Sequence, residues 1–200
     1  MSNLLRLVAC LLITSTAFFS VMSWAVIPEQ KVLASDGAAD NKFGFSVSID
    51  GNTAVIGTLY DEYCSCSGSA YVYVRSNGVW SEQAKLTASD GAAGDDFGNS
   101  VSIDGDTAVI GAYGDDDNGS AYVYVRNNGV WSEQQKLTAS DGAGWDRFGY
   151  SVSINGDTAV IGAFGGDENG LSSGSAYVFT RSNGVWTEQQ KLTAGDGAAY

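Results

Sequence analysis

The stretch FGNSVSIDGDTAVIGA, residues 97–112, contains two short runs that are typical of antiparallel strands. SVSI alternates small polar and branched apolar residues, and TAVIGA is a continuous run that favours a buried strand. Between them, Asp104-Gly105 supplies the positive φ angles that a two-residue hairpin turn requires. The stretch therefore predicts a β-hairpin.

This hairpin occurs three times in the chain. FGFSVSIDGNTAVIGT stands at 43–58 and FGYSVSINGDTAVIGA at 148–163, so the pattern returns about every 50 residues. A unit of this size that consists of strands cannot bury both of its faces alone, and stacking neighbouring units provides the missing cover. The repetition therefore predicts an array rather than a single mixed domain.

A second predicted hairpin follows each copy. After the central stretch, SAYVYVR (120–126) and VWSEQQKLTA (130–139) flank the turn Asn128-Gly129. Four antiparallel strands in a repeat of this length are typical of a β-propeller blade. We therefore predict an all-β propeller fold with three four-stranded blades at about 43–88, 97–139 and 148–194.

The segment EQKVLAS (29–35) precedes the first predicted blade and matches the fourth strand of the later repeats. It is predicted as an orphan fourth strand, which in closed propellers completes the last blade. Two aromatic positions recur in every repeat and are interpreted as packing residues between blades. The Phe fills a seam beside a Gly that permits close backbone approach; the residues are Phe43, Phe97, Phe148, Trp80, Trp131 and Trp186.

Composition narrows the possible functions. The formal charge is −13, which argues against nucleic acid or an anionic membrane surface as a partner because both repel an acidic protein. The chain has no histidine, so the commonest general base and zinc ligand are missing. We therefore predict that the protein is not an enzyme and has no cofactor.

Residues 1–25 are predicted to be a secretory signal peptide, cleaved near Ala25, and residues 26–200 the mature propeller. Arg6 precedes a long apolar run, and Ser23-Trp24-Ala25 offers a cleavage site with small flanking residues. The alternative is an uncleaved anchor, the only predicted membrane contact. The predicted location is secreted, periplasmic or cell-surface, where Cys64 and Cys66 meet conditions that permit disulfides. A bridge across one residue would be strained, so its formation is left open.

The motif FGxSVSIDGDTAVIGA…GSAYVYVR resembles the FG-GAP repeat of integrin α-chain propellers and of many secreted bacterial proteins, with VIGAYG (109–114) and VIGAFG (160–165) in the Gly-Ala-Pro position. The resemblance implies a propeller, of seven blades in the integrin case, and a role in adhesion. Three blades are fewer than closed rings use. The chain is expected to be part of a longer protein, to self-associate into a ring, or to form an open arc.

Many members of this family bind calcium in a loop between the first two strands of a blade. Here that place is the turn at Asp104-Gly105, which is too short to surround an ion. The variable loop after the second strand is acidic instead, and it is interpreted as a solvated turn, a weak Ca²⁺ site with Asp115 and Asp117 as ligands, or a catalytic cluster. The candidate ligand-loop residues are Asp61, Glu62, Asp115, Asp116, Asp117, Asn118, Asp167, Glu168 and Asn169.

The predicted function is a non-enzymatic, secreted or surface module that binds an extracellular protein or glycan through these loops. Two alternatives remain. The chain is an accessory propeller domain of a larger secreted enzyme, or it is a purely structural repeat array. A carboxylate-based hydrolase is disfavoured because its two acids need unlike environments, whereas these acids recur in every repeat.

Overall fold

A computed structural model describes residues 29–59, 67–166 and 173–195. These residues form three four-stranded antiparallel sheets and one short 3₁₀ turn, η1 (Asp115–Asp117). The strands follow chain order within each sheet: β1 (Ser46–Asp50), β2 (Thr53–Thr58), β3 (Ser69–Ser76) and β4 (Val79–Leu86); β5 (Ser100–Asp104), β6 (Thr107–Ala112), β7 (Ser120–Asn127) and β8 (Val130–Leu137); β9 (Phe148–Asn155), β10 (Thr158–Ala163), β11 (Ser175–Ser182) and β12 (Val185–Leu192).

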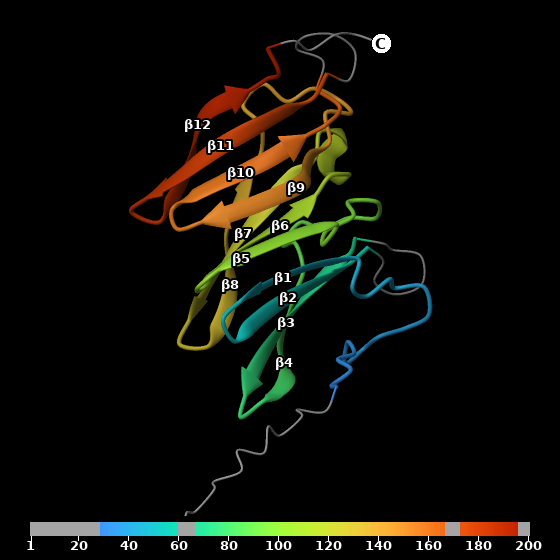
Figure 1. Ribbon diagram of the computed structural model, residues 1–200. Helices are drawn as coiled ribbons and strands as arrows, with labels where there is room; N and C mark the ends of the chain where they lie inside the picture. Colours follow the sequence, from blue (N-terminus) through green and yellow to red (C-terminus); the bar gives the residue numbers. More distant parts are fainter. Residues whose placement is uncertain (1–28, 60–66, 167–172, 196–200) are drawn as a thin grey trace, which may run out of the picture.

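The three sheets stack as successive blades of an open, propeller-like arc (Figure 1). The predicted fold class, an all-β propeller with about three four-stranded blades, is confirmed. First strands of neighbouring blades lie side by side, β1 beside β5 and β5 beside β9. Within the described ranges no helix has the length and hydropathy of a membrane span.

The two ends of each blade differ in kind. Tight hairpins join β1 to β2 and β3 to β4 at one end, and the same arrangement recurs in the other two blades. At the opposite end lie the loop between β6 and β7 and the connections that lead from one blade to the next (Figure 1). We call this second end the loop end. It carries the acidic loop of the second blade and the acidic connections, while the sheets hold the repeated apolar residues.

Each blade has one aliphatic and one aromatic face, because successive side chains of a strand point to opposite sides. In the second blade Val109 and Val123 lie on the aliphatic face, while Tyr122 and Tyr124 lie on the aromatic face. The aliphatic face of one blade packs on the aromatic face of the next, which forms one core between blades one and two and another between blades two and three. Trp131 is buried in the first core and Trp186 in the second.

The predicted Phe-Gly seam lies at these interfaces. Phe97 is fully buried and contacts Tyr122 edge-on, with 5.4 Å between the ring centroids. Gly98 follows at φ +91°, and a Cβ there would lie 2.3 Å from the Ser69 carbonyl oxygen of the preceding blade. Only glycine tolerates both this backbone conformation and this approach. Phe148 repeats the arrangement, while Phe43 is half-buried beside Tyr71.

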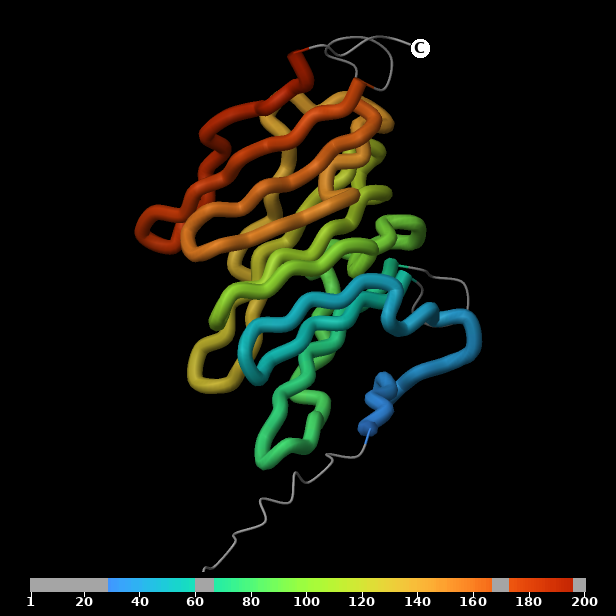
Figure 2. The backbone as a smooth tube through the Cα atoms, in the orientation of Figure 1, coloured from blue at the N-terminus to red at the C-terminus, as the bar shows by residue number. Residues whose placement is uncertain are grey.

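Residues 29–35, predicted as an orphan strand, are not a strand in the structure. A strand needs a neighbouring strand with which to form backbone hydrogen bonds. Within the described chain, the strand that would pair with this segment, the third strand of a preceding blade, is not present. The segment instead makes the contacts of a fourth strand through side chains and carbonyls. The side-chain amide of Gln30 donates to the Trp80 carbonyl and accepts from the Trp80 backbone amide. Gln135 makes the same two hydrogen bonds with Trp186. Figure 2 shows the segment, in blue, beside the first blade.

The two terminal faces of the arc are incompletely covered. Val47 in β1 is 68 % exposed, whereas Val101, its counterpart in β5, is 8 % exposed against the first blade. At the other end, Val160 in β10 is 37 % exposed, whereas its counterpart Val109 is fully buried. The uncovered faces are therefore the aromatic face of the first blade, partly capped by residues 29–43, and the aliphatic face of the third.

This asymmetry gives a matched stability test. Val109→Ala is expected to lower the free energy of unfolding by about 2 kcal/mol, because it leaves a cavity between two blades. Val160→Ala deletes the same atoms from a partly exposed face and is expected to cost less than about 1 kcal/mol. Urea denaturation measures both. Equal losses of unfolding free energy in the two variants at low protein concentration would contradict the conclusion that the aliphatic face of the third blade is uncovered.

Candidate functional site

The acidic loop of the second blade lies at the loop end, on the turn η1. Asp115 begins this turn and is buried, with 4 % of its surface exposed, whereas Asp116 and Asp117 are exposed. Asp116 and Asp117 adopt left-handed backbone angles, with φ of +50° and +63°. The sequence places three carboxylates side by side, but the backbone directs them into different surroundings.

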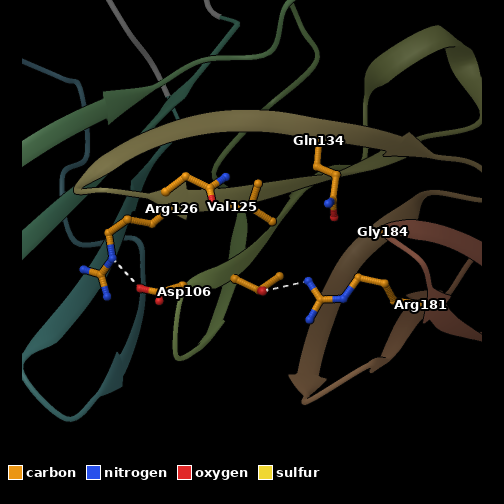
Figure 3. A pocket seen from close by; sticks show the side chains of 8 residues that line it. Asp106, Val125, Arg126, Gln134, Arg181 and Gly184 are labelled. Atoms are coloured by element: carbon orange, nitrogen blue, oxygen red, sulfur yellow. Dashed lines mark hydrogen bonds and ion pairs between the residues drawn. The ribbon is translucent and has the colours of Figure 1, made fainter.

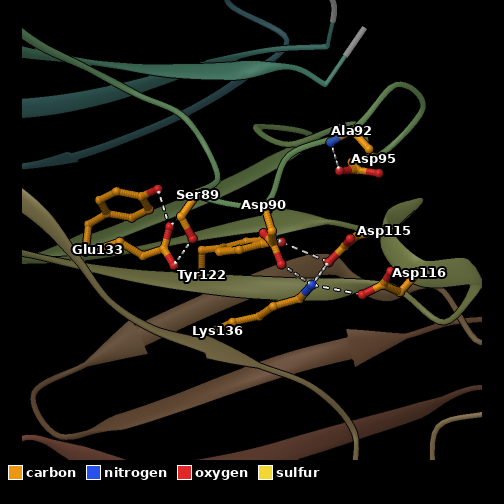
Figure 4. A network of polar contacts seen from close by, with 10 residues as sticks. Ser89, Asp90, Ala92, Asp95, Asp115, Asp116, Tyr122, Glu133 and Lys136 are labelled. Atoms are coloured by element: carbon orange, nitrogen blue, oxygen red, sulfur yellow. Dashed lines mark hydrogen bonds and ion pairs between the residues drawn. The ribbon is translucent and has the colours of Figure 1, made fainter. Parts of the chain in front are cut away.

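Lys136 from β8 forms ion pairs with two residues of this loop and with Asp90. Its ammonium lies 2.6 Å from Asp115, 2.8 Å from Asp90 and 3.0 Å from Asp116 (Figure 4). The hydroxyl of Tyr122 in β7 has a single proton, which it shares between Asp90, at 2.7 Å, and Asp115, at 2.9 Å. The buried carboxylate of Asp115 is thus paired and hydrogen-bonded, as a buried charge requires.

Part of this network recurs in every blade. Asp36 binds Lys85 and Tyr71, Asp90 binds Lys136 and Tyr122, and Asp141 binds Lys191 and Tyr177. The lysine hydrogen bond, followed by that of the tyrosine, holds the pKa of Asp36 and of Asp90 below its usual value, and the lysine hydrogen bond does the same for Asp141. Burial raises the pKa of Tyr177 to about 12. The repeated triad ties the connection between blades to the third and fourth strands of the following blade.

The Lys136 ammonium lies among the carboxylates of the second blade, where a bound cation would be expected. In the described part of the chain no group of three or more acidic, Cys or His side chains is arranged to hold a metal ion. Of the two predicted ligands, Asp115 points to Lys136, and Asp117 lies on a separate pocket described below. Asn118 donates to the Gly142 carbonyl of the next connection. Asp61, Glu62, Asp167, Glu168, Asn169 and both predicted loop cysteines lie outside the described residues.

A pocket of about 300 Å³ opens at the loop end between the second and third blades. We call it the Trp145 pocket; its lining includes Trp145, Arg147, Tyr113, Asp117 and Asp96. Trp145 is 73 % exposed, although tryptophan is normally largely buried. Sequence reasoning missed this pocket, since it concentrated on the acidic loops.

Arg147 lies among aromatic rings in this pocket. Its guanidinium carbon is 5.5 Å from the ring centroids of Tyr113 and Phe164 and 5.9 Å from that of Trp145. Tyr150 bridges the cluster, contacting Tyr113 at 5.5 Å and Phe164 at 4.5 Å between centroids. In the described chain no group accepts a hydrogen bond from the Arg147 side chain, so its N–H donors are available to a ligand.

Trp145 and Arg147 stand at two positions that vary between the connections, where the first connection has Asp40 and Lys42. Trp145 occupies the position of Gly94 in the previous connection, and Arg147 that of Asp96. The backbone is left-handed at both positions in both connections, with φ of +74° at Trp145 and +94° at Gly94. A bulky residue in this conformation costs about 1 kcal/mol relative to glycine. The fold therefore does not require tryptophan here, and its presence indicates another role.

A second depression of about 390 Å³ lies between the same blades at the hairpin end (Figure 3). There Arg181 pairs with Asp157 and donates to Thr107 of the preceding blade, and Arg126 does the same with Asp106 and Thr53. Because the arrangement occurs at both interfaces, it is explained by blade packing.

Stacked four-stranded blades with a left-handed glycine at each seam define a propeller-type repeat protein. The FG-GAP repeat model matches residues 27–73, 80–124 and 131–179, and the chain belongs to this family. Each matched unit begins before or within the fourth strand of one blade and ends in the third strand of the next. The first unit places residues 29–35 in the fourth-strand position.

Solved structures agree on the fold. Two crystal structures of Sqt1 from Chaetomium thermophilum are similar to the chain, with TM-scores of 0.55 and 0.54 and sequence identities of 16 % and 18 %. Each alignment covers 82 % of this chain and 38 % of the Sqt1 chain, so the protein spans well under half of their length. No curated protein matches the chain.

The repeated triads predict acid sensitivity. Folded-state pKa values below the ordinary 3.8 mean that Asp36, Asp90 and Asp141 stabilise the fold fully above that pH and lose this effect as pH falls through the folded values. The free energy of unfolding is expected to drop between about pH 4 and pH 2, measured by urea denaturation. Replacing the three residues by Asn should flatten this drop, and an unchanged slope would contradict the assignment.

Lys136 is expected to be the most important cation of the loop end. Lys136→Met leaves Asp115 buried without its ion pair and should lower the free energy of unfolding by about 2–3 kcal/mol. Asp116→Asn alters an exposed partner of the same lysine and should change it by less than about 0.5 kcal/mol. Similar effects of the two variants in thermal and urea melts would show that the network is not anchored at Asp115.

The same variant tests the predicted calcium site. Millimolar CaCl₂ is expected to leave the melting temperature of the wild type unchanged, because the Lys136 ammonium already lies between the carboxylates of Asp90, Asp115 and Asp116. It should raise that of Lys136→Met, whose carboxylates lack a counter-ion. MgCl₂ at equal ionic strength is the control. A calcium-dependent rise in the wild type would mean that the ion binds despite Lys136.

Proposed function

We propose that the protein is a non-enzymatic interaction module whose ligand binds at the loop end, in the Trp145 pocket. The observation that carries the proposal is Trp145 itself: an exposed indole in a left-handed conformation, at a position where the preceding repeat has glycine. The scaffold is rigid and repeated, and binding residues are commonly found on loops that such a scaffold holds in place.

The family supports an extracellular setting, since FG-GAP repeats are typical of extracellular proteins. The apolar N-terminus with Arg6 is consistent with secretion, and an extracellular protein or glycan is the ligand class that fits. The proposal does not involve nucleic acid, because the chain carries a formal charge of −13.

The catalytic alternative has little support in the geometry. Burial raises the pKa of Asp95, as a general acid needs, but its carboxylate accepts a hydrogen bond from the Ala92 amide within its own connection. Asp146 repeats this contact with Ala143, as expected for loop stabilisation. Asp90 and Asp115 are engaged by Lys136 and Tyr122. We therefore favour binding over hydrolysis. We also favour binding over a purely structural array, because packing between blades does not explain an exposed Trp145.

The terminal faces suggest a second kind of contact. The uncovered aliphatic face of the third blade has the residue pattern that packs on an aromatic face at both internal interfaces. We propose that another FG-GAP blade covers it, either in a longer polypeptide or in a second copy of the chain. Light scattering over a range of concentrations measures the molecular mass of the chain in solution. A mass that rises with concentration supports the second copy, and a constant monomer mass supports the longer polypeptide.

The interaction role is tested by restoring the repeat. Trp145→Gly combined with Arg147→Asp gives the third connection the residues of the second and should preserve or slightly raise the melting temperature. In biolayer interferometry against purified extracellular proteins and immobilised polysaccharides, the wild type should bind at least one member, and the double variant at least tenfold more weakly. Phe45→Ala, which removes an exposed aromatic on the first blade, is the matched control. Equal binding by wild type and double variant, or no binding at all, would refute the proposal.

A further inference from the structure

We infer that the Trp145 pocket binds a carbohydrate, with one sugar ring stacked on the indole and its hydroxyls held by the flanking charged groups. This inference rests on the proposed function and specifies its ligand class. It follows from three features of the pocket: an exposed aromatic plane, mixed donors and acceptors beside it, and a volume that suits one or two sugar residues.

The backbone of Trp145 is held on both sides. The Trp145 amide donates to the Asp117 carbonyl at 2.9 Å, which ties it to the acidic loop of the second blade. Its carbonyl lies so close to Gly165 that a Cβ on that residue would approach within 2.0 Å, and the Gly165 amide donates to Asp146 at 3.0 Å. The indole is exposed while its backbone is fixed. An indole has only two side-chain torsions, so with its backbone fixed it loses little conformational freedom when a ligand stacks on it.

The polar groups around the plane fit a sugar. Asp96 and Asp117 line the pocket, and a carboxylate can accept hydrogen bonds from hydroxyls. Arg147 supplies N–H donors, and its guanidinium lies beside three aromatic rings. A pyranose presents C–H groups on its faces and hydroxyls, which both donate and accept, around its edge. An aromatic plane bordered by acceptors and donors matches both surfaces.

Other ligand classes match less well. An anion such as a phosphate would meet two carboxylates, and an organic cation would meet the guanidinium of Arg147 at the aromatic rings. The volume of about 300 Å³ is at the lower limit of small-ligand pockets, as expected for a mono- or disaccharide end. A glycan terminus is therefore the occupant that the charges and size favour.

The site occurs once in the described chain. The preceding connection has Gly94 and Asp96 where this one has Trp145 and Arg147, and Leu59 stands in the position of Tyr113. The interface between the first two blades consequently lacks the aromatic plane, the guanidinium and the ring beside it. We expect one sugar site per chain.

The inference is tested by titrating the full mature chain with defined sugars. The probes are glucose, galactose, mannose, xylose, N-acetylglucosamine and glucuronic acid, and the disaccharides cellobiose, lactose and chitobiose. Binding of each sugar is measured by tryptophan fluorescence and by isothermal calorimetry. At least one probe should bind with a stoichiometry of one. Trp145→Gly should weaken binding at least tenfold, Trp145→Phe less than fivefold because it keeps a ring, and Phe45→Ala not at all. Asp117→Asn should weaken it three- to tenfold, through loss of a charged acceptor.

Two results would overturn the sugar assignment. The first is the absence of binding to every sugar in the panel, and the second is binding that survives Trp145→Gly unchanged. If the interferometry experiment nevertheless yields a protein ligand whose binding depends on Trp145 and Arg147, the pocket remains an interaction site and only its ligand class is wrong. Circular dichroism and melting temperatures of all variants show that any loss is not caused by unfolding.

Discussion

The structure depends on a backbone contact between two glycines at each interface of the arc. A Cβ on Gly111 would lie 1.9 Å from the carbonyl oxygen of Gly149 in the next blade, and one on Gly57 would lie 2.0 Å from that of Gly98. The same carbonyl groups accept hydrogen bonds from serine hydroxyls: that of Gly98 from Ser46 at 2.7 Å, and that of Gly149 from Ser100 at 2.8 Å. Close approach brings the aliphatic face of one blade against the aromatic face of the next. Neither face could be buried within its own sheet, so the contact explains why both glycines recur in the motif.

Repetition separates what the fold requires from what it does not. The Lys–Asp–Tyr triads and the Arg–Thr contacts occur at successive blades, and each has a structural explanation in holding one blade to the next. Trp145 and Arg147 replace Gly94 and Asp96 on a backbone of the same conformation. Because the scaffold tolerates glycine and aspartate there, the departure adds chemistry to the loop end without changing the blades.

Most of the fold could be predicted from sequence, because its signals are local. The turns at Asp104-Gly105 and Asn128-Gly129 and the alternation around them define the hairpins, and repetition defines their stacking. The surroundings of the acidic loop could not be predicted in this way. Lys136 reaches Asp115 and Asp90 across a sheet, and nothing local in GDDDNGS indicates that one carboxylate is buried beside an ammonium. The Trp145 pocket did leave a signal, the change from AGDD to GWDR between repeats, but it becomes meaningful only when the two connections are aligned.

Residues 29–35 place a condition on how the arc can be completed. The Ser35 hydroxyl and amide bind Glu82 as those of Ser89 bind Glu133, and the Leu33 carbonyl accepts from Tyr73 as that of Thr87 accepts from Tyr124. The segment thus already holds the place of a fourth strand against the first blade. A sheet that packs there can bring only three strands of its own and would use this segment as its fourth. The third blade of a second copy carries β12 in that place, so it must displace residues 29–35 before it can dock. Ring closure by further blades and closure by self-association therefore differ physically in whether this segment stays or leaves.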